Sequence, residues 1–140
     1  METYTKITVQ TTVNAPIDKV WELWTTPQHI VKWNNASPDW HTPIAENDLR
    51  SGGKFRSRME AKDGSFGFDF EGVYDAVEIN RLISYTMADG RTVNIVFTAK
   101  GNQTDIVEIF DAENENPIEM QQGGWQSILN NFKKYVEATI

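Results

Sequence analysis

The sequence predicts an α+β fold in which an antiparallel sheet of six strands packs against one long C-terminal helix. Three observations lead to this prediction. Residues 5–13 alternate apolar and polar side chains, which is typical of a half-buried strand. Residues 54–110 contain further apolar-rich runs separated by short turns, as in successive hairpins. Residues 117–140 carry apolar side chains at three- and four-residue steps, and a sheet face is the expected place to bury such a stripe.

Length and composition limit the class of protein further. A chain of 140 residues suits one hydrophobic core, so residues 1–140 are expected to form a single domain. The absence of cysteine excludes disulfides, thiolate metal ligands and a cysteine nucleophile. The net charge of −7 argues against a nucleic-acid partner. Neither a signal peptide nor an apolar run long enough to span a membrane is visible, so a cytoplasmic location is expected.

The expected order of elements is β-α-α-β-β-β-β-β-α. Two short helices follow the first strand, because Pro16 and Pro27 each suit a first helical turn and apolar residues follow at helical spacing. Residues 34–43 have no clear period and are expected to form an irregular connection into the sheet.

Pairing registers follow from the turns between the predicted strands. A four-residue loop at 61–64 sets Phe55 opposite Phe70. The next two hairpins pair Tyr74 with Tyr85 and Tyr85 with Val93, the latter through a turn with Gly90 in the left-handed region.

The last predicted hairpin places one carboxylate on the apolar face of the sheet. It pairs Ile95 with Glu108, so that Glu108 points inward between Ile106 and Phe110. An inward carboxylate needs a partner or a raised pKa, which makes Glu108 a candidate acid, base or ligand anchor. The alternative is a bulge, or a position near the open end of the sheet, that turns Glu108 toward solvent.

Four segments together resemble a known protein family. They are VNAPIDKVWELWTTPQHIVKW (13–33), GGKFRSRMEAKDGS (52–65), FEGVYDAVEINRLISYT (70–86) and the C-terminal pattern GGW…IL…F. In this order they are similar to the activator of heat-shock protein 90 ATPase homologue family (AHSA-type), within the START-like, or SRPBCC, helix-grip superfamily. The resemblance implies a curved sheet that grips the C-terminal helix and leaves an internal cavity.

The aromatic face of the sheet is the expected wall of that cavity, although plain core packing would give the same pattern. Gly123 and Gly124 are unfavourable inside a helix, which indicates a close approach of backbones or room for a bound molecule. The expected ligand contacts are Trp33, Trp40 and His41 at the mouth, Phe55, Phe68, Phe70, Tyr74, Tyr85 and Phe97 on the sheet, and Met120, Trp125 and Leu129 on the helix.

The two histidines do not predict a metal site. His29 and His41 are the only imidazoles, the chain has no thiolate, and no carboxylates stand at ligand spacing. His29 is expected to be a surface or partly packed residue. His41 and Trp40 are expected at the pocket mouth, either as a lid over a ligand or as a plug of the rim.

Three functions are consistent with the sequence. The first is binding of a small, largely hydrophobic ligand, such as a lipid-like or aromatic metabolite, by a monomer or homodimer without a cofactor. The second is an enzyme of the aromatase/cyclase or hydrolase kind that uses Glu108, His41 or a tyrosine for proton transfer. The third is a chaperone-associated stress-response protein that binds its partner through the outer sheet face or the short helices.

Overall fold

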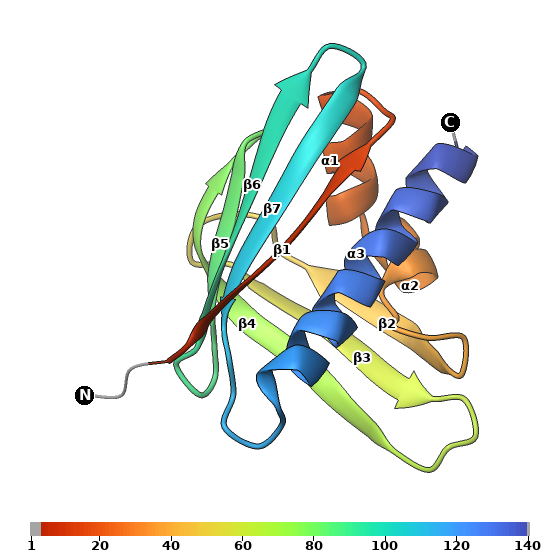
Figure 1. Cartoon of the computed structure of the whole chain (residues 1–140), viewed down its shortest axis with the longest axis vertical. Coiled ribbons are helices and arrows are strands. Elements are labelled where there is room, and N and C mark those ends of the chain that lie inside the picture. The colour runs from red at the N-terminus through yellow and green to blue at the C-terminus, as the bar shows by residue number, and fades with distance from the viewer. Residues whose placement is uncertain (1–3, 140) are drawn as a thin grey trace.

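The computed structural model describes residues 4–139 of the chain. Its elements are β1 (Lys6–Val13), α1 (Ile17–Thr25), α2 (Pro27–Trp33), β2 (Trp40–Asn47), β3 (Lys54–Ala61), β4 (Gly67–Glu78), β5 (Leu82–Met87), β6 (Thr92–Lys100), β7 (Gln103–Asp111) and α3 (Ile118–Thr139). All seven strands form one antiparallel sheet in the order β1-β7-β6-β5-β4-β3-β2. The sheet curves around α3, and α1 and α2 lie beside that helix (Figure 1). The predicted fold class is therefore confirmed, with seven strands rather than six.

The additional strand is β2, which occupies part of the segment predicted to be irregular. It pairs with β3, and the pairing register shifts between His41 and Ile44. Pro43 lies within this shift, and it has no N–H to donate to a neighbouring strand. Because a proline and a bulge disturb the alternation of side chains, the sequence gives only a weak strand signal here.

The β3–β4 register differs from the prediction by two residues. Ser57 rather than Phe55 lies opposite Phe70, and Phe55 lies opposite Gly72. The turn extends over residues 62–66, one residue longer than expected. A shift of two residues keeps every side chain on its predicted face of the sheet, so the aromatic residues of β3 and β4 still share one face.

The other registers that bear on the site are confirmed. Tyr74 pairs with Tyr85, Tyr85 with Val93, and Ile95 with Glu108. Gly90 has a φ of 92°, in the region that glycine adopts most readily. The positions of Tyr85 and Glu108 in the sheet could therefore be predicted from short turns that contain a glycine with positive φ.

An aromatic cluster joins α3 to the two short helices. The Phe132 ring is fully buried, with its centroid 4.7 Å from that of Trp24 and 4.9 Å from that of Trp33. Trp33 also donates a hydrogen bond of 2.9 Å from Nε1 to the backbone carbonyl of Leu23. This cluster holds α1, α2 and α3 together at one end of the sheet.

Polar side chains of α3 cover the outer edge of β1. Gln126 Nε2 donates to the backbone oxygen of Gln10 at 3.1 Å, and its Oε1 accepts from the Gln10 N–H at 3.3 Å. Lys133 Nζ donates to the backbone oxygen of Thr12 at 2.7 Å. These contacts give hydrogen-bond partners to backbone groups that an edge strand leaves unpaired.

The N-terminal end of α3 differs from the predicted apolar stripe. Ile118 is partly exposed, whereas Gln121 is buried. Gln121 Nε2 donates to the carbonyls of Glu113 and Asn116 at 3.1 and 2.8 Å, and its Oε1 accepts from the Glu113 N–H. Gln121 therefore fixes the chain where it enters the helix, and the apolar stripe starts one turn later.

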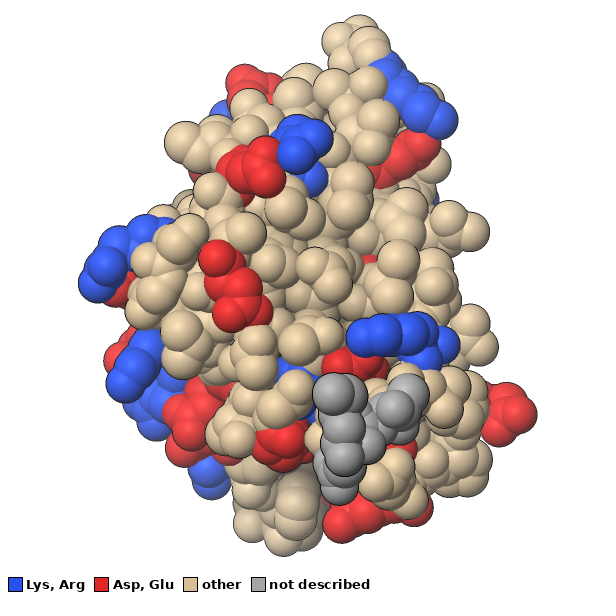
Figure 2. All heavy atoms as spheres, turned by 90° about the vertical axis from the view of Figure 1, so that its left-hand side faces the viewer, with Lys and Arg blue, Asp and Glu red and all other residues tan. Residues whose placement is uncertain are grey.

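Charged side chains of both signs are interspersed on the face shown in Figure 2. Among residues 4–139 as a whole, many charged side chains form local ion pairs, for example Arg56 with Glu46 at 2.5 Å and Lys100 with Asp105 at 2.6 Å. No helix among residues 4–139 is long and apolar enough to cross a membrane.

Candidate functional site: a pocket between the sheet and the C-terminal helix

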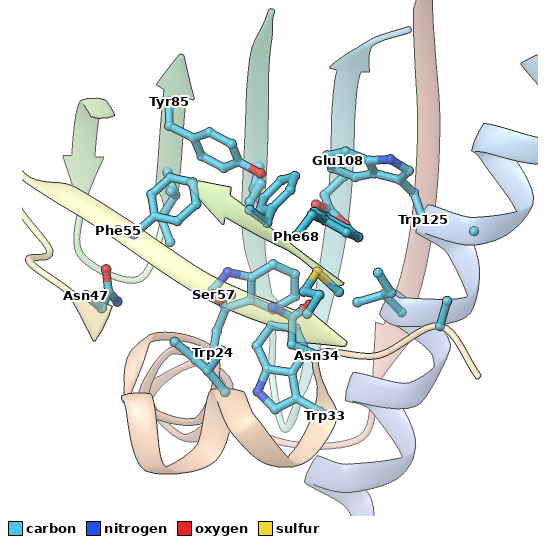
Figure 3. Close-up of a pocket in the computed structure, with 18 of the residues that line it drawn as sticks. Trp24, Trp33, Asn34, Asn47, Phe55, Ser57, Phe68, Tyr85, Glu108 and Trp125 are labelled. Carbon is cyan, nitrogen blue, oxygen red and sulfur yellow. The ribbon is translucent and has the colours of Figure 1, made fainter. Parts of the chain in front are cut away.

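The structure contains a pocket of about 500 Å³ between the sheet, α2 and α3. In Figure 3, Phe55 and Tyr85 extend from the sheet, Trp24 and Trp33 lie on the side of α1 and α2, and Trp125 approaches from α3. Small-molecule pockets typically measure about 300–1,000 Å³ and are lined mainly by apolar and aromatic groups with a few polar ones. The size and lining of this pocket fit that description.

Nine of the residues singled out from the sequence line the pocket. They are Trp33, Trp40, Phe55, Phe68, Phe70, Tyr74, Tyr85, Trp125 and Glu108. Most come from sheet positions on one face, and the alternation of side chains along a strand explains why they could be selected together.

Four other predicted contacts lie outside the lining. Phe97 is buried in the core, with its ring 5.3 Å from that of Trp21, because α1 covers this end of β6. Leu129 is fully buried in the core, while its neighbour Ile128 faces the pocket. We therefore leave Phe97 and Leu129 out of the proposed site.

His41 and Met120 are also left out of the site. His41 follows Trp40 in β2, and successive side chains of a strand point to opposite faces. Its Nε2 lies 3.7 Å from a carboxylate oxygen of Glu60, its partner in β3. Met120 is 62% exposed, because it lies on the first turn of α3, before the helix reaches the pocket.

Several lining residues were not predicted. Trp24, Asn34, Asn47, Ser57, Met59 and Arg91 are among them. Trp24 is one of the apolar residues that follow Pro16 at helical spacing, which predicted a helix but no pocket contact, and the polar residues had no distinguishing pattern in the sequence. They come from elements far apart in the chain, so the curvature of the sheet brings them together.

Gly124 lines the pocket, and Gly123 next to it does not. A Cβ atom added at either position would meet no atom within 4 Å. A close approach of backbones therefore does not explain these glycines. At position 124, the missing side chain leaves room in the pocket.

One polar group of the pocket is held within the protein. The Tyr74 hydroxyl donates to Asn47 Oδ1 at 2.5 Å, and Asn47 Nδ2 donates to the backbone oxygen of Thr25 at 2.7 Å. Burial raises the pKa of Tyr74, so its hydroxyl stays protonated as a donor. This chain of hydrogen bonds ties β4 to β2 and to the end of α1.

Two further polar groups face the pocket without an internal partner. Glu108 is 6% exposed and Tyr85 is 7% exposed, and both line the pocket. No group among residues 4–139 forms a hydrogen bond with either side chain. In the same part of the chain, every side-chain oxygen that is fully enclosed has a hydrogen-bond partner, so the unpaired oxygens of Glu108 and Tyr85 are not fully enclosed. Their oxygens therefore remain accessible from the cavity.

Burial changes the acidity of both groups. It raises the pKa of the Glu108 carboxyl to about 8, since an apolar environment disfavours the charged form. Burial also raises the pKa of Tyr85 well above 10, and the nearby charge of Glu108 raises it further. Around neutral pH the phenol of Tyr85 is therefore protonated, whereas the carboxyl of Glu108 can be either protonated or ionised.

The histidines have separate environments. His29 Nδ1 and the Tyr135 hydroxyl share a hydrogen bond of 2.6 Å, which joins α2 to α3. Within residues 4–139, no group of three or more histidine or acidic side chains is arranged to hold a metal ion.

A curved antiparallel sheet that holds a C-terminal helix, with a pocket between them, defines the helix-grip class of the START-like superfamily. Residues 14–137 match the family model described as Activator of Hsp90 ATPase homolog 1-like protein. The chain belongs to this family.

Solved structures agree with this assignment. The AHSA1-like protein from Aeromonas hydrophila is 46% identical, with a TM-score of 0.89 over 96% of this chain and 93% of that one. Chr148 from Cytophaga hutchinsonii is 60% identical, with a TM-score of 0.83 over 95% and 92% of the two chains. Protein NE0264 from Nitrosomonas europaea, 18% identical, shares the fold with a TM-score of 0.83 over 99% and 97%. Comparison with curated proteins gives no significant match.

Proposed function

We propose that this protein binds a small, largely hydrophobic molecule in the pocket between the sheet and α3. The observation that carries the proposal is a cavity of about 500 Å³ with aromatic walls, into which an unpaired carboxyl and a phenol open. Apolar walls supply most of the binding free energy, and a few polar groups orient the ligand.

We also expect a cytoplasmic location and a single domain, in line with the sequence.

The pocket provides its own optical signal for a binding test. Trp24, Trp33, Trp40 and Trp125, four of the five tryptophans, line it. Titration with a panel of lipids and aromatic metabolites is therefore expected to change tryptophan fluorescence in a saturable way. If no member of the panel gives such a change, the proposal is wrong.

Substitution of Gly124 by leucine should fill part of the pocket and weaken binding of any ligand found by the panel at least tenfold. The free energy of unfolding should stay the same or rise, because glycine inside a helix is about 1 kcal/mol less favourable than a good helix former. Fluorescence titration and urea unfolding measure the two effects separately.

The matched control for this experiment is Gly123→Leu. Gly123 is the exposed neighbour in the same helix, and an added Cβ there also meets open space. The control should gain the same helix propensity and leave ligand affinity unchanged. Equal affinities of the two variants for the ligand would contradict a site in this pocket.

A second candidate function is proton-transfer catalysis, of the aromatase/cyclase or hydrolase kind. It is favoured by the position of Glu108, whose raised pKa near 8 suits a general acid or base around neutral pH. For a ligand found by the panel, wild-type protein is expected to convert it, as followed by ¹H NMR, and Glu108→Gln is expected to lose that conversion. No conversion by the wild type, or equal conversion by the variant, would contradict an enzyme that uses Glu108.

A further inference from the structure

Glu108 stands apart from the other charged residues of the pocket lining. Glu46 is paired with Arg56 at 2.5 Å, and Arg91 Nε lies 2.7 Å from Asp89 Oδ2. Glu108 is the third charged lining residue, and it has no ion pair or hydrogen bond within the described chain. The two paired residues already have partners of opposite charge, whereas the carboxyl has none.

The surroundings of Glu108 offer no internal partner. Its neighbours in the adjacent strands are Val9 of β1 and Ile95 of β6, and both are buried and apolar. The pocket residues contributed by α1, α2 and α3 are uncharged. The other titratable lining groups are Tyr74, Tyr85 and Glu46 on the sheet and Arg91 in the turn between β5 and β6. The fold therefore presents this carboxyl to whatever occupies the cavity.

We infer that the hydrophobic molecule bound in this pocket carries an ammonium group that pairs with Glu108. This inference rests on the proposed ligand-binding function and specifies the class of ligand. A buried carboxylate without a partner is unfavourable, and a ligand cation that supplies one forms a strong, weakly screened interaction. An anionic ligand would instead meet the ionised carboxylate without compensation, because Arg91 is already paired with Asp89.

Aromatic rings around the carboxyl are also suited to a cation. Trp125, Phe70 and Tyr85 line the same pocket as Glu108. Cations bind favourably against the faces of such rings when water is excluded. The apolar part of an amine would occupy the rest of the cavity.

An ammonium partner makes ligand affinity depend on pH. With a pKa of about 8, Glu108 is half ionised at pH 8 and only about 1% ionised at pH 6. Because the ammonium pairs with the ionised form, affinity should fall about 50-fold between pH 8 and pH 6. Neither histidine lines the pocket, and both tyrosines have raised pKa values, so these groups do not supply this dependence.

Three probes of similar shape test the inference: 2-(1-naphthyl)ethylamine, 2-(1-naphthyl)ethanol and 3-(1-naphthyl)propionate. Calorimetric titration of the full chain at pH 8 and constant ionic strength should show the amine binding at least tenfold more tightly than the alcohol. The amine should lose affinity toward pH 6, and titrations in two buffers should detect proton release on binding at pH 7. The affinity of the alcohol should change little over this range.

Two variants separate the role of Glu108 from general effects. In Glu108→Gln, the amine should lose its advantage over the alcohol and its pH dependence. In Glu71→Gln, which removes an exposed carboxylate outside the pocket, all three affinities should match the wild type. If the alcohol binds but the amine binds no better, or if Glu108→Gln keeps the preference, the inference is wrong while the proposed function stands. If none of the three probes binds but a ligand of the panel does, the inference is wrong and the proposed function stands; if neither the probes nor the panel bind, both are wrong.

Discussion

Glu108→Gln is expected to be more stable than the wild type at neutral and alkaline pH, by a margin that grows with pH. The folded protein holds the Glu108 pKa at about 8, against 4.5 for an unperturbed glutamate. Between these values the folded state binds more protons than the unfolded state, so stability falls as the pH rises. The stabilising contribution of the protonated carboxyl is complete below pH 4.5 and is lost as the pH rises through 8.

The size of this effect follows from the pKa difference. Each unit corresponds to about 1.4 kcal/mol, so the difference in unfolding free energy between variant and wild type should increase by about 3 kcal/mol from pH 4.5 to pH 7. Above pH 9 the increase should level off at about 4 kcal/mol. Glutamine keeps the shape of the side chain and cannot ionise, so it removes this dependence.

Urea unfolding of both proteins from pH 4.5 to pH 9 measures the difference directly. Lowered pKa values of other carboxyls, such as Asp105 and Asp111, affect both proteins alike and cancel in the comparison. Glu71→Gln should run parallel to the wild type, because Glu71 is exposed. A constant difference between Glu108→Gln and the wild type would show that Glu108 is not a buried, unpaired carboxyl.

Phe132→Ala is expected to lower the free energy of unfolding by about 3–5 kcal/mol, as found for large aromatic residues removed from protein cores. The ring is fully buried against Trp24 and Trp33 and makes edge-on contacts with both. Such contacts add roughly 0.5–1.5 kcal/mol each beyond burial of area. Their removal leaves a cavity where α1, α2 and α3 meet.

Met120→Ala provides the control on the same helix. Met120 is 62% exposed, and its truncation should change stability by no more than about 0.5 kcal/mol. Chemical denaturation of the two variants gives the comparison. A loss below about 1 kcal/mol for Phe132→Ala would show that the aromatic cluster does not hold α3 in place.

The sequence predicted the sheet best where turn chemistry was explicit. Gly90 and Gly101 both adopt positive φ in short turns, and the registers of Tyr85 and Glu108 depend on those turns. The β3–β4 turn also has a glycine with positive φ, Gly64, but it spans five residues rather than the expected four, and its register was wrong by two residues. Strand β2 was missed because Pro43 and a bulge interrupt its alternation.

The candidate site was predicted on the sheet better than elsewhere. A strand assigns each side chain to a face, so Phe55, Phe70 and Tyr85 could be placed without knowledge of the tertiary structure. The apolar stripe of the helix did not separate pocket residues from core residues. Leu129 and Trp125 share a face of the helix, but only Trp125 lines the pocket. Contacts such as the hydrogen bond between Asn47 and Tyr74 depend on the curvature of the sheet, which local patterns do not encode.

The hydrogen bonds from α3 to β1 also affect how copies of this chain can associate. A sheet has two edges, and here the backbone of one edge is engaged by Gln126 and Lys133. Continuation of the sheet into a second molecule is therefore restricted to β2. A fibre built by pairing strands between molecules needs two available sheet edges on every molecule. Because each molecule here has only the β2 edge available, pairing of sheet edges can join two chains and no more.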